Sequence, residues 1–306
     1  MAGAAGMADP GRDAVFPLAG TLAPLTREKL IAGIADPQNR RPSVSQERAA
    51  SRFRARLRAG AFMAGTFIKT PASEIVEIMA RAGVDFICLD AEHSALGRRE
   101  LDWCLALARA LDLPTLVRLS HASPEAALQA LDGGASGLLV PHVRSPALAA
   151  DVARWARFGA GGRGYAGSTR HGDFTARPMA DFLAAAGEEV SVIAQIEDPE
   201  ALDQVEAIAA TPGIDGVFFG AADLGVGLGL GRSGGAEIDR AFSRVASAAQ
   251  ASGRAFGAYG ATPSALAGLR ARGVSLALIG SDQGMVLAGA RTLAEAGSLQ
   301  NERITQ

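Results

Sequence analysis

Cysteine and lysine are scarce in this sequence of 306 residues. The two cysteines, Cys88 and Cys104, lie in segments with apolar periodicity, so we expect them to pack as small hydrophobic side chains. A disulfide or a cysteine metal site is not expected. The two lysines, Lys29 and Lys69, leave little scope for chemistry that needs a lysine amine.

A charge excess and long apolar runs are also missing. The net charge is near −2 and no basic-aromatic module is present, so nucleic-acid binding is not expected. No apolar run reaches the roughly 18 residues of a membrane helix. Asp9, Arg12 and Asp13 interrupt the segment in which a signal peptide would have its apolar core. These absences predict a cytoplasmic protein that does not bind membranes.

The character of the chain changes near residue 60. Residues 1–59 mix small residues, prolines and charges, and we interpret them as a partly irregular N-terminal extension with a short helix over 46–59. The arginines of this helix recur at every second residue and so spread around it, which predicts a solvated helix; a partner-binding arm is the alternative. Residues 60–306 are expected to form one domain with a substantial core.

Short apolar runs and helix-periodic segments alternate from residue 61 onward. The runs are residues 61–68, 85–89, 115–119, 137–141, 191–196, 216–220, 255–259 and 276–280. Strands that alternate with helices pair in parallel, and eight of them are the number that closes a (β/α)8 TIM barrel. An open doubly wound sheet is the alternative, but the turn after its first strand would be a glycine-rich phosphate loop, and GTFIKTPAS is not one.

The turns of this repeat are of two kinds. Gly83, Gly134, Gly213 and Gly273 each lie just past a predicted helix, where glycine adopts a left-handed conformation without steric cost. Proline with serine or threonine, as in ASPE and RSPA, marks the turns at which helices begin. The alternation is the one required if every helix runs antiparallel to the strands.

Polar residues gather at one end of the predicted strands. They are Asp90, Glu92 and His93 in LDAEHS, Arg118, His142, Gln195, Glu197 and Asp223. Each has a structural explanation alone, as a buried ion pair or a helix cap. In a barrel, however, the carboxyl ends of all strands meet at one mouth, where active sites lie. Their convergence therefore favours a functional site.

The chemistry that these side chains allow is narrow. Glu197 and Asp223 are hard oxygen ligands that suit Mg²⁺, Mn²⁺ or Co²⁺, and no zinc spacing is present. Arg118 offers a fork of donors to an oxyanion. His93 can move a proton, and Asp90 can orient it. Together they predict a metal-dependent aldolase.

Four motifs carry a family resemblance. LDAEHS, LVRLS, VIAQIED and GVFFGAADL, in this order, resemble the HpcH/HpaI family of class II pyruvate aldolases over about residues 60–297. The resemblance implies a lyase that cleaves or forms a 4-hydroxy-2-oxo acid, from pyruvate and an aldehyde, through a metal-stabilised pyruvate enolate. It also implies a homohexamer with exchanged C-terminal helices.

The resemblance assigns a role to each matched residue. Glu197 and Asp223 would bind the metal, and Gln195, Gly220 and Ala222 would line the substrate side.

Arg118 would stabilise the enolate. His93, in a dyad with Asp90, would act through water on the substrate hydroxyl, supported by Glu92. Asp132 would lie near a neighbouring subunit's site.

The sequence departs from the family pattern near the substrate. The usual G-P-A-D has Ala221 in place of proline, and the glycine-rich segment 225–235 is shorter than the common loop, which leaves the aldehyde undefined. Segment 163–174 falls where the family has an arginine-glycine loop. Its candidates for holding a substrate carboxylate are Arg163, Ser168, Thr169 and Arg170.

Three other functions compete with the aldolase. The first is condensation of an enolate onto a keto acid, or cleavage of a thioester, within the same superfamily. The second is imine chemistry on Lys69, because Lys29 lies outside the barrel. The third is a barrel without catalysis that acts through its N-terminal arm.

Overall fold

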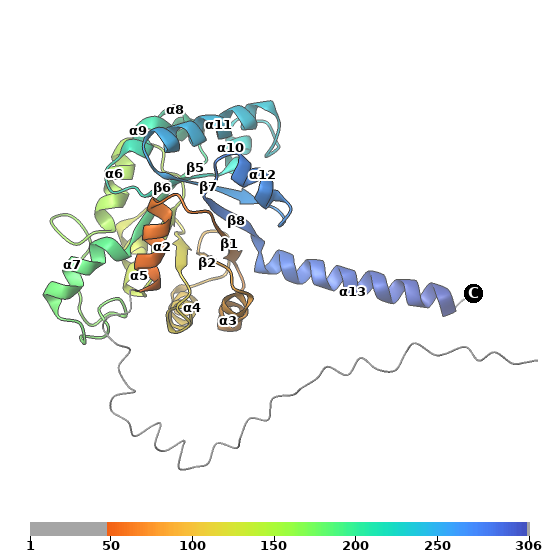
Figure 1. Cartoon of the computed structure of the whole chain (residues 1–306), viewed down its shortest axis with the longest axis horizontal. Coiled ribbons are helices and arrows are strands. Elements are labelled where there is room, and N and C mark those ends of the chain that lie inside the picture. Colours follow the sequence, from red (N-terminus) through yellow and green to blue (C-terminus); the bar gives the residue numbers. More distant parts are fainter. Residues whose placement is uncertain (1–47, 305–306) are drawn as a thin grey trace, which may run out of the picture. The chain divides into compact units, whose positions relative to one another are not determined.

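The computed structural model describes residues 48–304, with side chains described as far as residue 296. Residues 1–47, which hold Lys29 and most of the predicted extension, lie outside the described residues. Within the described part, parallel strands close into a barrel in the order β1-β2-β3-β4-β5-β6-β7-β8 (Figure 1). The predicted (β/α)8 TIM barrel is confirmed.

Every strand of the barrel coincides with one of the predicted apolar runs. The strands are β1 (Met63–Ile68), β2 (Phe86–Asp90), β3 (Thr115–Arg118), β4 (Gly137–Val140), β5 (Ser191–Ile196), β6 (Gly216–Phe219), β7 (Ala255–Gly260) and β8 (Leu276–Ser281). Their register sets neighbours at the carboxyl ends, so that Asp90 of β2 lies beside Arg118 of β3.

The helices surround this barrel. They are α2 (Ala49–Arg58), α3 (Ser73–Ala82), α4 (Arg98–Ala110), α5 (Pro124–Asp132), α6 (Pro146–Trp155), α7 (Met179–Glu189), α8 (Pro199–Asp203), α9 (Val205–Ala210), α10 (Ala221–Gly227), α11 (Ala236–Ala251), α12 (Ala265–Ala271) and α13 (Asp282–Ile304). The alternation did not predict the additional helices α7 and α10, and residues 199–210 form two short helices, α8 and α9.

The predicted turn chemistry is confirmed. All four glycines expected in the left-handed region have positive φ, between 76° at Gly83 and 100° at Gly134. At the opposite turns, the hydroxyls of Ser123 and Ser145 accept hydrogen bonds from the first turns of α5 and α6, each of which has proline at its start.

Helix α2 closes the N-terminal end of the barrel. Its Phe53 and Leu57 belong to the same apolar cluster as Met63 and Phe86 of the barrel interior. The expectation of a solvated helix is therefore wrong for this face, on which Arg54 is buried as well. Phe53 and Leu57 are four residues apart and so share one side of the helix, although arginines alternate around them.

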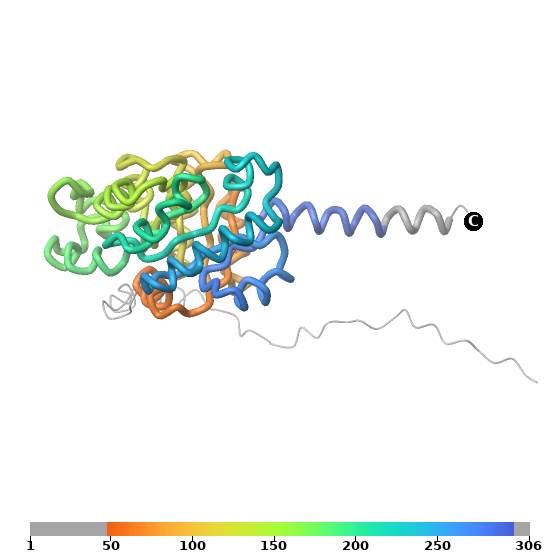
Figure 2. The backbone as a smooth tube through the Cα atoms, turned by 90° about the horizontal axis from the view of Figure 1, so that it is seen from above, coloured from red at the N-terminus to blue at the C-terminus, as the bar shows by residue number. Residues whose placement is uncertain are grey.

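Helix α13 extends away from the barrel (Figures 1 and 2). Val286, Leu287 and Leu293 are all more than half exposed on it. Its first residue, Asp282, is buried and accepts hydrogen bonds of 2.9 Å from the backbone nitrogens of Lys69 and Thr70, just after β1. In the described part of the chain, no helix is long and apolar enough to cross a bilayer.

Candidate active site

The carboxyl ends of neighbouring strands bring most of the predicted polar residues together. Asp90 ends β2 and Arg118 ends β3, while Glu197 directly follows β5. His142 follows β4 and contacts Glu197 through its backbone nitrogen, at 2.9 Å. The barrel therefore positions acids, a guanidinium and an imidazole at one mouth, as predicted.

Asp90 and Arg118 form a two-pronged ion pair. The Arg118 Nε and Nη2 atoms donate to the two carboxylate oxygens of Asp90 at 2.9 and 2.6 Å. Burial acts to raise the pKa of Asp90, but the hydrogen bonds and charge of Arg118 outweigh it and lower that pKa. The Lys69 ammonium lies 3.3 Å from Asp90, and the Phe67 ring lies 4.6 Å from the Arg118 guanidinium. Asp90 is thus a fixed anion that holds Arg118 in place.

The LDAEHS segment folds around the same carboxylate. Asp90 Oδ1 accepts hydrogen bonds from the backbone nitrogens of Glu92 and His93, at 3.2 and 3.1 Å. The ring of His93 instead lies next to Glu92, with 3.7 Å between Nε2 and Oε2. In this structure the His93 ring therefore lies beside Glu92, and not beside Asp90, the partner that the resemblance implied. Asp90 is taken up by Arg118, whose charge and fork of donors make it the stronger partner.

Glu197 is also buried at this end of the barrel, at 2% exposure. It accepts hydrogen bonds from the His142 backbone and from Gln195 Nε2. Burial raises its pKa, and the hydrogen bond from His142 offsets this only in part. A side chain at Gly220 would come within 2.6 Å of the Glu197 Cβ atom, so glycine is required for this close approach.

His142 has more contacts than the sequence predicted. Its Nδ1 lies 3.0 Å from Asp198 Oδ2, and its Nε2 lies 3.7 Å from Glu92 Oε1. Burial acts to lower the pKa of His142, but Asp198 and Glu197 outweigh it and raise that pKa. The sequence placed His142 at a strand end without a role, and Asp198 only next to Glu197. Asp198, which directly follows the Gln195-Ile196-Glu197 motif, is the sequence feature that could have predicted a carboxylate partner for His142.

The potential ligand atoms at this mouth are arranged so that they could bind a divalent cation. The acceptor atoms Glu92 Oε2 and Gln195 Oε1 are buried and lack a hydrogen-bond partner among the described residues. One ligand atom each from Glu92, His142 and Glu197 lie within 4.8 Å of one another. Buried acceptors without donors are costly, and a hard cation would satisfy them. The predicted ligand Asp223 is exposed in the first turn of α10, and its charge acts on the pKa of Glu92.

Comparison with known proteins agrees with this geometry. The profile of the HpcH/HpaI aldolase/citrate lyase family matches residues 63–288. The chain belongs to this family. The prediction that it is an enzyme, a carbon–carbon lyase, is confirmed with it.

Relatives of several activities share the family. A hydroxypyruvate/pyruvate aldolase of Sagittula stellata is 37% identical over 58% of this chain and 70% of its own. A crystal structure of a family member from Burkholderia cenocepacia J2315 has a TM-score of 0.77 and 32% identity, and covers 81% of this chain and 99% of that one. The citrate synthase SbnG has a TM-score of 0.73 and 26% identity over 81% of this chain and 98% of its own.

The segment that corresponds to the family's arginine-glycine loop lies at the other end of this barrel. Arg163 is buried and donates to Asp132, the last residue of α5, and Arg163 Nη1 lies 2.9 Å from His171 Nδ1. Arg170 pairs with Asp102 at 2.8 Å. The expectation that Arg163 or Arg170 holds a substrate carboxylate is wrong for the site of the same chain, because α5 ends at the N-terminal end of the strands.

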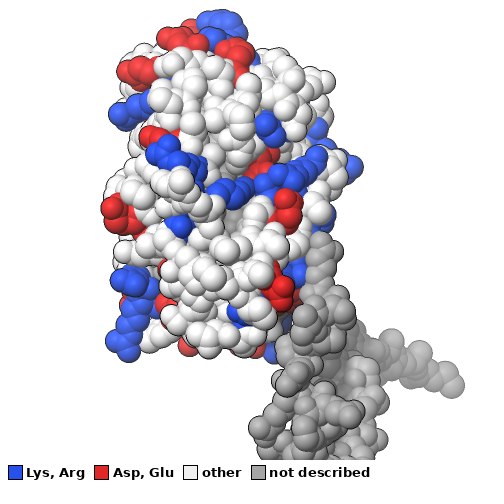
Figure 3. All heavy atoms as spheres, turned by 90° about the vertical axis from the view of Figure 1, so that its left-hand side faces the viewer, with Lys and Arg blue, Asp and Glu red and all other residues white. Residues whose placement is uncertain are grey.

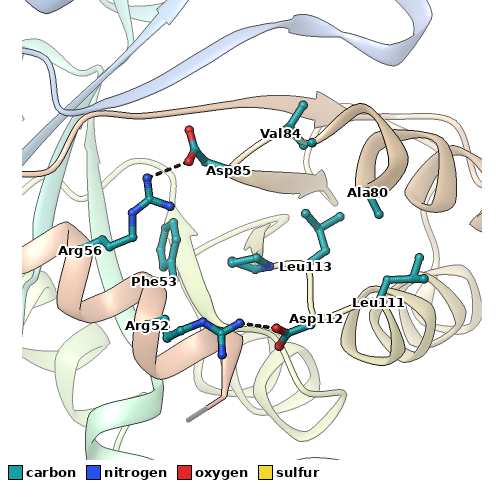
Figure 4. Close-up of a pocket in the computed structure, with 11 residues that line it drawn as sticks. Arg52, Phe53, Arg56, Ala80, Val84, Asp85, Leu111, Asp112 and Leu113 are labelled. Carbon is teal, nitrogen blue, oxygen red and sulfur yellow. Dashed lines mark hydrogen bonds and ion pairs between the residues drawn. The ribbon is translucent and has the colours of Figure 1, made fainter. Parts of the chain in front are cut away.

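Other features of the surface lie away from the mouth. A hollow of about 340 Å³ lies between α2 and the ends of α3 and α4, flanked by the Arg52–Asp112 and Arg56–Asp85 pairs (Figure 4). None of the predicted site residues lines it. On the face that carries α7, positive and negative side chains are interspersed (Figure 3).

Proposed function

We propose that this enzyme is a class II aldolase that reversibly cleaves a 4-hydroxy-2-oxo acid into pyruvate and an aldehyde, with Mg²⁺, Mn²⁺ or Co²⁺ held by Glu197 and Asp223. One observation carries the proposal: next to Glu197, the buried atoms Glu92 Oε2 and Gln195 Oε1 have no hydrogen-bond partner among the described residues, and the fixed guanidinium of Arg118 lies 3.4 Å from Glu92 Oε2. A bound divalent cation would polarise the 2-oxo group and make an enolate accessible near neutral pH.

The chain's own residues then supply orientation and proton transfer. Asp90 occupies Nε and Nη2 of Arg118, so the guanidinium cannot rotate, and Nη1 lies 3.4 Å from Glu92. Arg118 can therefore donate to the enolate oxygen without reorganisation. The His93 ring, which is half exposed beside Glu92, exchanges a proton between water and the substrate hydroxyl.

The substrate side is formed by the residues around Glu197. Gln195 has one amide oxygen free to accept from a substrate or a bound water. Gly220 allows pyruvate to approach Glu197, and Ala222 lies next to Asp223 at the mouth. The likeness to a pyruvate aldolase supports pyruvate as the enolate donor.

A second candidate is condensation of an enolate onto a keto acid. The likeness to a citrate synthase favours it, and the same Arg118 and Glu197 would serve. The glycine-rich segment 225–235 next to Asp223 would admit the larger acceptor. Mass analysis of the products from oxaloacetate and acetyl-CoA distinguishes it from the aldolase.

The proposal includes a homo-oligomer in the cytoplasm, with the hexamer as the expected state. The exposed apolar side chains of α13 support a partner for this helix, because such a surface is costly in water. Asp132 would reach a substrate only in another subunit, since it lies at the N-terminal end of its own barrel. Light scattering of the full chain measures the state directly, and a monomer would contradict it.

The experiment that tests the activity is pyruvate release from a panel of 4-hydroxy-2-oxo acids, followed by coupled reduction to lactate. We expect release that EDTA abolishes and that added Mg²⁺, Mn²⁺ or Co²⁺ restores. Full activity in chelator-treated protein would contradict the metal-dependent mechanism. No release from any substrate, with metal shown to bind, would favour the condensation reaction.

A further inference from the structure

His142 is held in an uncommon backbone conformation at the end of β4. Its φ is 53°, in the left-handed region that few residues other than glycine adopt. In this conformation its backbone nitrogen donates to Glu197 Oε1 at 2.9 Å. Such strain persists only where the surroundings enforce it, and it is common at functional sites.

The orientation of the His142 ring is also fixed. Nδ1 lies 3.0 Å from a carboxylate oxygen of Asp198, and a carboxylate only accepts, so Nδ1 carries the proton. Arg144 holds the other oxygen of Asp198 at 3.1 Å. The neutral ring then has its lone pair on Nε2, which lies 3.7 Å from Glu92 Oε1. A histidine that donates one ring nitrogen to a carboxylate is the usual form of a metal-binding histidine.

The side chains around the His142 ring have the spacing of a coordination shell, since Nε2 lies 3.7 Å from Glu92 Oε1 and Nδ1 lies 3.5 Å from Glu197 Oε1. Single atoms of Glu92, His142 and Glu197 lie within 4.8 Å of one another. Ligands about 2.1 Å from a central ion are separated by about 3.0 Å when adjacent and by about 4.2 Å when opposite. Two buried acceptors in the same place, Glu92 Oε2 and Gln195 Oε1, lack hydrogen-bond partners among the described residues.

We infer that His142 Nε2 is a nitrogen ligand of the catalytic cation, alongside Glu197 and with Glu92 contributing from the loop after β2. The inference rests on the proposed function for the presence of the cation, and adds a ligand to the pair Glu197 and Asp223. Imidazole favours transition metals over Mg²⁺. The site is therefore selective for Co²⁺ or Mn²⁺ over Mg²⁺.

Pulsed electron paramagnetic resonance of the Mn²⁺-loaded full chain tests this directly, because a coordinated imidazole produces a nitrogen coupling. The variant is His142→Asn, since asparagine tolerates positive φ, and the control is His121→Asn, at a histidine that pairs only with its neighbour Ser120 among the contacts described. We expect the coupling in the wild type and in the control, and its loss in His142→Asn. The dissociation constant of Mn²⁺ rises at least about tenfold in that variant, and that of Mg²⁺ rises less.

Asp198→Asn separates ligation from folding. It keeps the histidine but weakens its orientation, so we expect the nitrogen coupling to persist while Mn²⁺ affinity falls about tenfold. A wild-type protein that binds Mn²⁺ without nitrogen coupling would overturn the inference, whether or not His142→Asn folds. In that case metal-dependent pyruvate release would still support the aldolase. Absence of any Mn²⁺ binding would also overturn the inference, whereas pyruvate release that depends on Mg²⁺ or Co²⁺ would still support the aldolase.

Discussion

Two buried glutamates at opposite ends of the barrel, Glu189 and Glu197, differ in the direction of their pKa shifts. At the N-terminal end, Glu189 is 4% exposed and receives hydrogen bonds from Arg177 and His171, which outweigh burial and lower its pKa to about 2. At the other end, Glu197 is 2% exposed but has only a backbone nitrogen and an amide as donors, and burial raises its pKa. Burial alone therefore does not decide the state of an acid.

We interpret this difference as a division of roles, in which the N-terminal end of the barrel serves stability and the carboxyl end serves the proposed chemistry. At the closed end, Arg54 of α2 pairs with Asp215, just before β6, at 3.0 Å, and both side chains are buried. At the mouth, Glu92 keeps a buried carboxylate oxygen that has no hydrogen-bond partner among the described residues. Functional sites commonly lose stability in this way, which the rest of the fold compensates. Variants at the two ends should consequently affect different measurements.

The largest effect is expected for Glu197→Gln, which removes a charge at the mouth. Activity should fall at least about 10²- to 10³-fold, because the cation and enolate lose their anionic partner. The free energy of unfolding should change by less than about 1 kcal/mol, since a buried acid with a raised pKa contributes little to stability. Steady-state kinetics and urea unfolding check this, with Glu206→Gln, in an exposed pair with Arg244, as control. Strong destabilisation of the Glu197→Gln variant would contradict the view that Glu197 serves the site and not the stability of the fold.

The converse variant is Arg54→Met at the closed end. Because Arg58 and Arg157 also lie 3.1 and 3.6 Å from Asp215, removal of Arg54 should lower the free energy of unfolding by about 1–3 kcal/mol. The matched control Arg56→Met breaks an exposed pair with Asp85 and should cost at most about 1 kcal/mol. Chemical unfolding measures both. Turnover per folded molecule should remain at the wild-type value, and its loss would mean that the two ends are not separate.

The pH dependence of stability sharpens the comparison. The pKa of Glu189 is lower in the folded protein than in the unfolded chain, so the unfolded chain binds more protons. Its contribution is complete above the ordinary value of 4.5 and is lost as the pH falls from there towards about 2. The wild type should lose up to about 3 kcal/mol over this window. Glu189→Gln should give a flatter profile; equal slopes would refute the assignment. The control is Glu188→Gln, at the exposed residue that precedes Glu189.

The smallest effect is expected for Lys69→Met. The Lys69 ammonium is ion-paired with Asp90, so it does not serve as an amine nucleophile. The partly exposed Lys69–Asp90 pair is worth about 1 kcal/mol. Its loss should therefore reduce activity by less than about tenfold. Borohydride treatment with pyruvate should leave no adduct on the wild type, as mass spectrometry would show. A trapped adduct on Lys69 would revive imine chemistry.

The strands and the mouth were predictable because buried parallel strands appear as continuous apolar runs. Once eight such runs were placed, polar residues such as Arg118 and Glu197 had to converge. Segment 163–174 was placed at the wrong end, although its position directly after a predicted helix showed that the chain had already returned to the N-terminal end. Its contact with Asp132 follows from that return.

Other contacts depended on the folded structure. The ring of His142 pairs with Asp198 because β4 and β5 are neighbours and because φ of His142 is positive. No local sequence pattern encodes the positive φ of His142. Nor does one show that its ring pairs with Asp198 and not with the adjacent Glu197. The choice of Asp90 between Arg118 and His93 likewise depends on strand register. The sequence therefore indicated which polar residues meet at the mouth of the barrel better than it indicated their contacts.

The buried carboxylate of Asp282 has a mechanical consequence. It is the first residue of α13, yet its two oxygens fix the backbone at Lys69 and Thr70, directly after β1 and two residues from Phe67, whose ring covers Arg118. A force on α13 would thus be transmitted through these two hydrogen bonds to the end of β1, where the Phe67 ring packs against the Arg118 guanidinium. A partner bound to α13 would therefore also act on the alignment of Arg118, the residue that we propose stabilises the enolate.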